Sequence, residues 1–461
     1  MNKVHTFETG QTMTLAHFLT AHSFADLPPE TTRRAKDFVL DTLGATIGGV
    51  ATTEARIVAD HTRDQGGREE CTVVGHDFRT NAANAAFANS LASHVLELDD
   101  THRDSIMHVA APVIPAALAM AERQGSSGAD FLASVVLGYE AGIRPANAIQ
   151  PSHWSRGFLV MGTCGAFGSA AAAGHLLGFD ADRLGNALGL AGMYAASINS
   201  SIYGEGDMGK RLSPAHAASS GISAAMLAAR GFTGSKGVFE GQKGFCMAFS
   251  DDYDLSRITD NLGTPWEIMR SSMKPYACCR YNHGAIDGLL HIMATEGLTA
   301  ADIAEVTVAT FEAAVLNRRH STQPVTHFDG QMSIPFSLAV AAHAGALSFA
   351  DFPEALIASP QHQAFATRVK LVADPELTRA FPKDWSTRVT IETTDGRTFT
   401  HHVPYPKGEP EAWMTDDEIR GKFLDLAALE MSRDQAEDIV ALVYALDAEP
   451  NMDRLARLLA R

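Results

Sequence analysis

The sequence predicts a mainly α protein, with a large all-helical domain and a smaller α+β domain inserted into it. Three observations indicate this. Alanine- and glycine-rich segments with helical periodicity fill the N-terminal half. Strand-like alternation begins only after about Leu262, and the stretch from Thr415 onward is again amphipathic and helical. We therefore expect the all-helical domain over residues 1–264 and 406–461 and the α+β domain over residues 265–405.

The helical half contains segments whose apolar residues recur at three- and four-residue spacing. Small residues at Gly-x-x-x-Ala spacing let helix axes approach closely, which favours a compact bundle. Only Glu70 to Val74 has strand character in this half. The expected helices span Thr32 to Gly49, Asn81 to Leu98, Ala111 to Gln124, Gly128 to Gln150, Gly162 to Leu177, Ala181 to Ser197 and Ser213 to Ala229.

The inserted domain is identified by its strands. Val306 to Phe311 alternates in strand fashion. Arg388 to Ile391 and Phe399 to Val403 form a predicted hairpin around Asp395-Gly396, a dipeptide that suits tight turns with positive φ. The C-terminal stretch that follows carries acidic residues early and arginines late, as the helix dipole favours. We expect this stretch to pack back onto the first domain.

Composition limits the classes of partner. The chain has 461 residues, which is long for one core and predicts two domains. Hydrophobic residues make up 46% and charged residues 20%, which excludes long disorder. A formal net charge of −17 argues against nucleic acid and anionic membranes as general partners, because both need a basic face. A small anionic substrate remains possible, since lysines and arginines can be concentrated locally.

Cysteine content and the apolar segments bear on location. Five cysteines, an odd number in so long a chain, form no disulfide framework and suit a reducing compartment. Met1 to Glu8 lacks the apolar core of a signal peptide. The most apolar stretch, Met161 to Ser197, is interrupted by Asp180 and Asp182 before it could cross a bilayer. We expect a cytoplasmic protein without a membrane partner.

The most informative run is Asp99-Asp100-Thr101-His102, followed by His108 and by the apolar segment Ala111 to Pro115. Histidine can give or take a proton near pH 7, and a neighbouring carboxylate fixes its tautomer and raises its basicity. The preceding helix is expected to end near Asp99, so the run lies on a turn. The alternative to proton transfer is that the two acids cap helices and that His108 is a packing residue.

A glycine-rich segment, Gly204 to Gly209, satisfies G-x-G-x-x-G and, with Lys210, nearly a phosphate loop. The phosphate loop needs Ser or Thr after the lysine, and here Arg211 follows. The dinucleotide fingerprint needs a preceding buried strand, whereas Gly192 to Asn199 has helical character. These contexts disfavour nucleotide binding, although such a loop ending in Lys-Arg can still bind a small oxyanion.

Cys278, Cys279 and His283 could suggest a metal site. Adjacent cysteines rarely chelate one zinc ion, and the spaced second pair of a structural zinc site is missing. We interpret them as small, semi-buried residues in a loop and expect no metal.

Four stretches occur together in one order along the chain. They are Leu98 to His102 with His108; Arg156 to Phe158 leading into Gly162 to Gly168; Gly206 to Leu212; and Met273 to Arg280 with His283. In this combination the chain resembles the MmgE/PrpD family, whose members include 2-methylcitrate dehydratases, cis-aconitate decarboxylases and iminodisuccinate epimerases. The likeness covers nearly the whole chain.

The resemblance implies a fold and a site. The α+β domain would be a lid on the helical domain, and the protein a homodimer without metal or organic cofactor. The active site would lie between the domains and be built from Asp100, Thr101, His108, Lys210 and Lys274. The family's substrates are small di- or tricarboxylates, and its reactions begin or end with a proton moved at a carbon next to a carboxylate.

These residues have expected roles. Removing a proton from such a carbon produces an enediolate, which Lys210 and Lys274 would stabilise electrostatically. His108 is the expected acid or base, with Asp100 orienting it or binding substrate. The expected substrate-binding residues are Thr101, His102, Arg211, Tyr276, Arg280 and His283.

The chain departs from the family pattern at several positions. Leu159 stands where many relatives carry an active-site histidine, and Ser213 also replaces a histidine. Phe336 replaces an active-site tyrosine, and Val109 a proline. Fewer polar groups make the pocket less polar, which indicates a substrate with fewer carboxylates or with an apolar substituent. Ordinary drift at these positions is the alternative.

The leading expectation is a cofactor-independent lyase that dehydrates a 2-methylcitrate-like hydroxy acid by proton abstraction next to a carboxylate. A decarboxylase or an epimerase of the same family is the alternative, because these reactions differ only in how the carbanion forms or is consumed. Outside this class, the chain could be a non-catalytic carboxylate-binding protein. Leu159 and Phe336 favour that interpretation, and the retained acid, histidine and lysines disfavour it.

Overall fold

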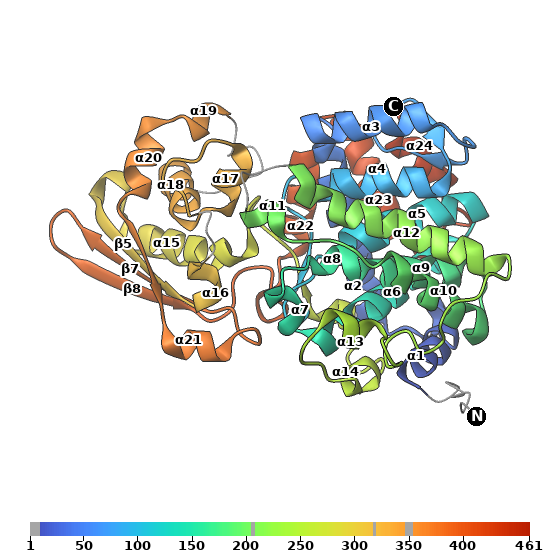
Figure 1. Cartoon of the computed structure of the whole chain (residues 1–461). Helices are drawn as coiled ribbons and strands as arrows, with labels where there is room; N and C mark the ends of the chain where they lie inside the picture. Colours follow the sequence, from blue (N-terminus) through green and yellow to red (C-terminus); the bar gives the residue numbers. More distant parts are fainter. Residues whose placement is uncertain (1–9, 204–207, 317–319, 346–353) are drawn as a thin grey trace.

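The computed structural model describes residues 10–203, 208–316, 320–345 and 354–461. A helical body and a smaller part with a sheet stand side by side, so the fold is mainly α as predicted (Figure 1). Each part has its own apolar core. One core draws on residues between Met13 and Met273 and between Met414 and Leu459, and the other on residues between Cys278 and Ile391.

The helical body consists of long helices joined by short turns. They are α1 (Gln11–Thr20), α2 (Pro29–Gly49), α3 (Thr53–Gln65), α4 (Ala82–His94), α5 (Ala110–Gln124), α6 (Gly128–Ile149), α9 (Gly165–Leu176), α10 (Ala181–Tyr194) and α12 (Leu212–Ala229). Shorter helices between and after them are α7 (Ser152–Ser155), α8 (Val160–Thr163), α11 (Ser200–Tyr203), α13 (Phe245–Phe249) and α14 (Ser256–Thr259).

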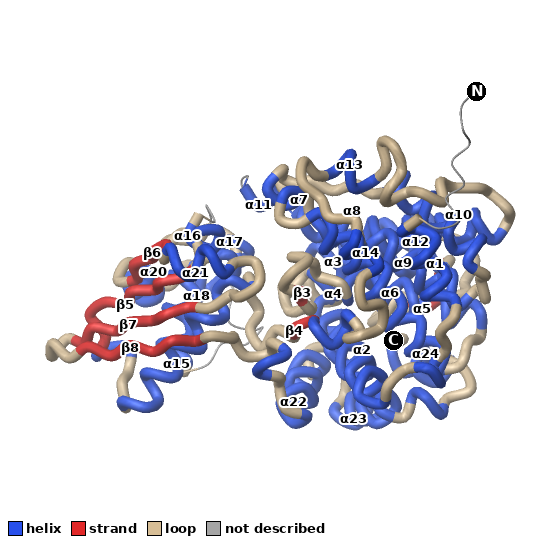
Figure 2. Tube along the Cα trace, turned by 90° about the horizontal axis from the view of Figure 1, so that it is seen from below, coloured by secondary structure: helices blue, strands red, loops and turns tan. Residues whose placement is uncertain are grey.

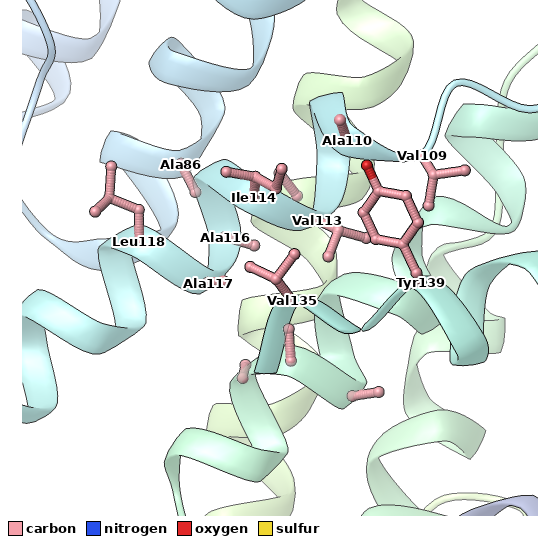
Figure 3. Packing of buried hydrophobic residues seen from close by; sticks show 14 of the residues in the cluster. Ala86, Val109, Ala110, Val113, Ile114, Ala116, Ala117, Leu118, Val135 and Tyr139 are labelled. Atoms are coloured by element: carbon pink, nitrogen blue, oxygen red, sulfur yellow. The ribbon is translucent and has the colours of Figure 1, made fainter. Parts of the chain in front are cut away.

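Small residues bring the central helices close together. Helix α9 packs against α5, α6, α10 and α12. A Cβ atom on Gly168 of α9 would lie 2.7 Å from the carbonyl oxygen of Gly138 in α6, so this approach needs glycine. Next to it, Val113 of α5 and Val135 and Tyr139 of α6 lie in the core (Figure 3). No helix in the described ranges is long and apolar enough to cross a membrane.

The C-terminal stretch packs against the N-terminal half. Its helices are α22 (Asp416–Ala427), α23 (Arg433–Tyr444) and α24 (Asp453–Leu459). Helices α22 and α23 contact α2. At the end of the chain, the Gly75 N–H donates to the Leu459 carbonyl at 2.9 Å and the Arg461 N–H to the His76 carbonyl at 3.2 Å. The two ends of the chain therefore build one body.

The smaller part contains a four-stranded sheet in the order β6-β5-β7-β8. Strand β5 (Ile303–Thr310) pairs parallel with β6 (Val369–Ala373) and antiparallel with β7 (Thr387–Thr393), which pairs antiparallel with β8 (Thr398–Val403). The predicted strand near Val306 and the predicted hairpin are confirmed. Helix α15 (His283–Glu296) packs on β7 and β8 (Figure 2). The other helices of this part are α16 (Glu312–Val315), α17 (His327–Met332), α18 (Ile334–Ala344), α19 (Glu354–Ile357), α20 (Pro360–Ala366) and α21 (Pro375–Ala380).

Several predicted boundaries were wrong. The helix predicted to reach Leu98 ends at His94, because Glu97 has a left-handed backbone with φ of 55°. The segment predicted from Gly162 as one helix is broken at Cys164 into α8 and α9. The predicted strand from Glu70 is reduced to β1 (Cys71–Thr72), which pairs with β2 (Arg79–Thr80).

Among the described residues, the chain passes between the two parts near Met273 and near Gly408, and these two crossings lie side by side. The Met273 N–H donates to the Gly408 carbonyl at 3.0 Å. Gly408 has a φ of +90°, and a Cβ there would lie 1.9 Å from the Met273 carbonyl oxygen, so the position requires glycine. Beside it, the buried Glu409 carboxylate binds Arg103 at 3.2 Å and Arg280 at 2.7 Å.

Candidate active site

A cleft between the two parts is lined by residues from both. Its empty volume is about 800 Å³, which includes the space at its mouth that is open to the solvent. Helices α7, α8 and α11 stand on the side of the body that faces the smaller part (Figure 1). The charged and hydroxyl-bearing lining residues include Glu97, Thr101, His108, Lys210 and Arg280. The apolar lining residues include Ile106, Trp154, Leu159, Met161, Met332 and Trp385.

The loop from Val95 to Val109, here called the floor loop, joins α4 to α5 and carries most of the polar lining. Glu97 and Ile106 have positive φ angles of 55° and 54°, which are uncommon for residues other than glycine. Within the loop, β3 (Thr101–His102) pairs antiparallel with β4 (Ser271–Ser272). Pairing to a neighbouring segment and the ion pairs of Glu97 hold this backbone in place.

His108, the predicted acid or base, lines the cleft. Its Nδ1 lies 2.7 Å from the Asp100 carbonyl oxygen, which can only accept, so Nδ1 carries the hydrogen. In the neutral ring the lone pair is then on Nε2, which makes no hydrogen bond to any described residue. Burial lowers the pKa of His108 to about 3, with Asp99 acting against the shift and Lys274 adding to it.

Asp99 lies beneath His108 and connects it to a second histidine. The Nδ1 of His94 donates to Asp99 Oδ2 at 2.8 Å, and His108 Nδ1 is 3.5 Å from the same oxygen. Burial alone would raise the pKa of Asp99, but the two histidines and Lys274 hold it well below its ordinary value. Asp99 is therefore a permanent buried anion under the imidazole pair.

Glu97 balances two lysines. Its carboxylate forms an ion pair with Lys210 and lies 3.6 Å from Lys274 Nζ, which also donates to the Glu97 carbonyl at 3.0 Å. Burial would raise the pKa of Glu97, yet Lys210, His94 and Lys274 lower it well below its ordinary value. Glu97 and Asp99 together offset Lys210 and Lys274, so this buried cluster is close to neutral.

His94, Asp99 and His108 are also the described residues that could hold a metal ion, with ligand atoms within 4.8 Å of one another. Lys274 Nζ lies 4.0 Å from Asp99 Oδ1 and would share this carboxylate with any bound cation. Like charges at that range oppose each other. The expectation of a site without a metal stays a prediction, and these residues are where it would be tested.

Asp100 faces away from the cleft. Its Oδ1 accepts from the N–H groups of Val109 and Ala110, both at 2.8 Å, and its Oδ2 accepts from the Tyr139 hydroxyl at 2.8 Å. In Figure 3 the Tyr139 hydroxyl is directed toward Ala110. Burial raises the pKa of Asp100 to about 7. The side chain of Asp100 fixes the start of α5, and its main-chain carbonyl orients His108.

Thr101 and Arg280 complete the polar lining. The Thr101 hydroxyl lies 3.4 Å from His108 Nδ1. Arg280 binds Glu409 through Nε and NH2, at 3.1 and 2.7 Å, and donates to His283 Nδ1 at 2.8 Å. Its guanidinium is thus held by a carboxylate of the protein.

The other predicted site residues lie outside the described lining of the cleft. Lys274 is fully buried behind Glu97. The remaining residues contact other polar groups: His102 lies 3.3 Å from Glu267, Arg211 3.1 Å from Glu54, the Tyr276 hydroxyl 2.6 Å from Asp287, and His283 2.8 Å from Arg280. Their roles in substrate binding stay predictions.

Among the departures from the family pattern, only Leu159 lines the cleft. Phe336 is buried in the core of the smaller part. The Ser213 hydroxyl forms a hydrogen bond with Ser197 at 2.5 Å. Of the glycine-rich segment, residues 204–207 lie outside the described residues.

Glu97 was not predicted as a site residue. The sequence shows the charge of Glu97 and its spacing from His94 and Asp99, but it does not show the left-handed backbone or the two lysine partners. The aromatic lining residues were also missed. Trp154 and Trp385 are 231 residues apart in the sequence, and the fold brings both to the lining of the same cleft.

The helical body, the smaller part with its sheet, and the cleft between them define a two-part protein with a buried cluster of histidines, carboxylates and lysines at the cleft. The chain belongs to the MmgE/PrpD family, as predicted. The model of the MmgE/PrpD N-terminal domain matches residues 13–258, and that of the C-terminal domain matches residues 276–448.

Curated relatives point to two activities. The cis-aconitate decarboxylase of Aspergillus terreus strain NIH 2624 is 29% identical over 480 residues, covering 98% of this chain and 96% of the relative. The cis-aconitate decarboxylase of Homo sapiens is 26% identical over 440 residues, covering 93% and 90%. The 2-methylcitrate dehydratase of Cupriavidus necator is 27% identical over 260 residues, covering 52% and 51%. The relatives are lyases, which supports an enzyme.

Proposed function

We propose that the protein decarboxylates a small unsaturated polycarboxylate of the cis-aconitate type. The observation that carries this is the extent of the similarity. The decarboxylase of Aspergillus terreus matches over 98% of this chain, whereas the dehydratase matches over 52%. Dehydration was the leading expectation from the sequence, and these relatives support its alternative, decarboxylation, better.

In the proposed reaction, CO₂ leaves from the carboxylate that is attached to the saturated carbon next to the double bond. The breaking C–C bond gives its electron pair to a new double bond. The electrons of the old double bond move to the carbon beside a remaining carboxylate and form an enediolate. One proton then binds that carbon. The balance is substrate anion plus one proton giving product plus CO₂.

His108 would supply this proton from Nε2. In the unliganded protein burial keeps its pKa near 3, so the ring is neutral at pH 7. A bound polycarboxylate adds negative charge beside the ring and raises that pKa, so the substrate itself favours protonation. Lys210, which lines the cleft, would stabilise the enediolate.

Dehydration is the second candidate, and one observation favours it. The neutral His108 ring has its lone pair on Nε2, which is the form that a general base needs. A base would remove a proton next to a carboxylate of a hydroxy acid, and hydroxide would leave from the neighbouring carbon.

Proton NMR of the purified protein in D₂O, with cis-aconitate and with 2-methylcitrate, separates the two. Decarboxylation gives CO₂ and a product carrying one solvent deuteron. Dehydration gives an unsaturated acid with all its carboxylates. If neither substrate turns over, the protein does not have the proposed activity on these acids. A homodimer, a cytoplasmic location and independence of cofactors stay predictions.

A further inference from the structure

One wall of the cleft is an apolar surface of the helical body. Trp154, Leu159, Val160 and Met161 lie within eight positions of one another at α7 and α8. The Leu159 N–H donates to the Ser197 carbonyl at 3.2 Å, so the backbone of this wall is held in place. Leu159 is 7% exposed and Met161 2%.

The smaller part provides a second apolar wall. Trp385, Tyr281 and Ala313 line the cleft there. The Tyr281 ring meets Trp385 edge-on with ring centroids 5.0 Å apart, and both rest on Phe311. Trp385 is only 4% exposed, so its ring cannot readily move aside. A ligand in the cleft therefore contacts apolar groups from both parts.

The cations in the described lining of the cleft are already balanced. Lys210 is paired with Glu97, and Arg280 with Glu409 at 2.7 Å. They can share their charge with two carboxylates of a ligand. A third carboxylate would lie against the apolar walls, where no described cation compensates for the loss of its hydration.

We propose that the preferred substrate is an unsaturated dicarboxylate that carries an alkyl chain where cis-aconitate carries its central carboxylate. The alkyl chain of the substrate would lie between Leu159 and Trp385, and its two carboxylates would face Lys210 and Arg280. The inference rests on the proposed decarboxylation, which it specifies.

The reaction still balances for this class, of which a 3-alkylglutaconate is the simplest member. One carboxylate leaves as CO₂ and its bond electrons form a terminal double bond. The other carboxylate holds the enediolate, which takes one proton. The product is a 3-alkylbut-3-enoate, and no further reactant is needed.

Binding of unreactive saturated acids to the full-length protein tests the proposal by calorimetry. Propane-1,2,3-tricarboxylate and the 3-methyl-, 3-propyl- and 3-pentylglutarates differ only in the central group. We expect affinity to rise about fourfold per methylene, the fold-change that burying one CH₂ corresponds to. Tighter binding of the tricarboxylate than of 3-propylglutarate, or no binding of any of these acids, would overturn the proposal.

Two variants test whether the alkyl chain of the ligand contacts Leu159. Leu159→His should abolish the dependence on chain length, and Leu429→His, at a position 49% exposed outside the cleft, should leave it unchanged. If Leu159→His does not fold, Leu159→Asn replaces it. Chain-length dependence that survives in the folded variant contradicts the assigned wall.

The two proposals fail separately. The saturated acids cannot lose CO₂ by the proposed route, so their binding reports on the cleft alone. Tight binding of alkylglutarates without turnover of cis-aconitate or 3-propylglutaconate rejects the decarboxylation and keeps the alkyl site. Turnover of cis-aconitate faster than of 3-propylglutaconate rejects the alkyl preference and keeps the decarboxylation.

Discussion

Asp99 and Asp100 are neighbours in sequence, and both are fully buried, yet they belong to different regions. Asp99 faces histidines and a lysine under the cleft. Asp100 faces two backbone N–H groups and a tyrosine hydroxyl at the start of α5. The pKa of Asp99 is lowered and that of Asp100 is raised. The histidines and Lys274 outweigh burial in the first region, and the N–H groups and the tyrosine hydroxyl do not in the second.

His108 joins the two regions, because its Nδ1 lies near the side chain of Asp99 and donates to the main chain of Asp100. Asp99 therefore contributes charge to the site, and Asp100 holds its backbone in place. Substitutions can test this distinction.

The largest effect is expected at His108. We expect His108→Gln to reduce turnover by about 10²- to 10⁴-fold, the usual contribution of a general acid or base. Its melting temperature should stay near that of the wild type, because the Gln amide can still donate to the Asp100 carbonyl. Steady-state kinetics and thermal unfolding measure the two effects. The exposed His17→Gln is the matched control, and comparable activity of both variants would exclude His108 from the chemistry.

The second effect tests the charged region. Glu97→Gln leaves Lys210 and Lys274 without their carboxylate, and breaking such a buried pair costs about 3–5 kcal/mol of unfolding free energy. Urea unfolding measures it. The control is Glu305→Gln, which removes the partner of the exposed Lys370 and should cost far less. Equal costs for the two variants would show that Glu97 does not balance the lysines.

The smallest effect is a pH dependence. The folded pKa of Asp100, about 7, lies above its ordinary 3.8, so the folded state binds this proton more tightly. The contribution of Asp100 to the unfolding free energy therefore falls as pH rises from about 4 to about 7, by at most about 1.4 kcal/mol per pH unit. His108 acts in the opposite direction, since its folded pKa, about 3, lies below 6.5.

Asp100→Asn should remove the part of the fall that is due to Asp100 and leave the rise due to His108. Burial also raises the pKa of Glu140, which keeps the rest of the fall. Urea unfolding between pH 4 and pH 7 compares the two proteins. Tyr139→Phe, which keeps the carboxyl and loses one donor, is the control and should retain the falling component. Parallel pH profiles for wild type and Asp100→Asn would mean that Asp100 does not titrate in this range.

Much of the fold was predictable because it depends on local pattern. Helical periodicity predicted α5, α6 and α12, and Asp395-Gly396 predicted the β7-β8 hairpin. The parallel strand β6 was missed, because its pairing with β5 joins segments far apart in the chain. The end of α4 was misplaced, because the left-handed Glu97 is held by lysines from distant segments.

The site was predictable in its chemistry but not in its contacts. The sequence predicted His108 and Lys210, and both line the cleft. It could not predict that Lys274 lies behind Glu97 or that the side chain of Asp100 points to α5. Residue type indicates what a group can do, and only the backbone path decides what it faces.

The paired crossings at Met273 and Gly408 have a mechanical consequence. Glu409 lies next to these crossings and binds Arg280 of the cleft and Arg103 of the floor loop. The arginine of the smaller part and the loop that carries His108 are therefore held by the same buried carboxylate. The distance between the two sides of the cleft at this end depends on that one residue.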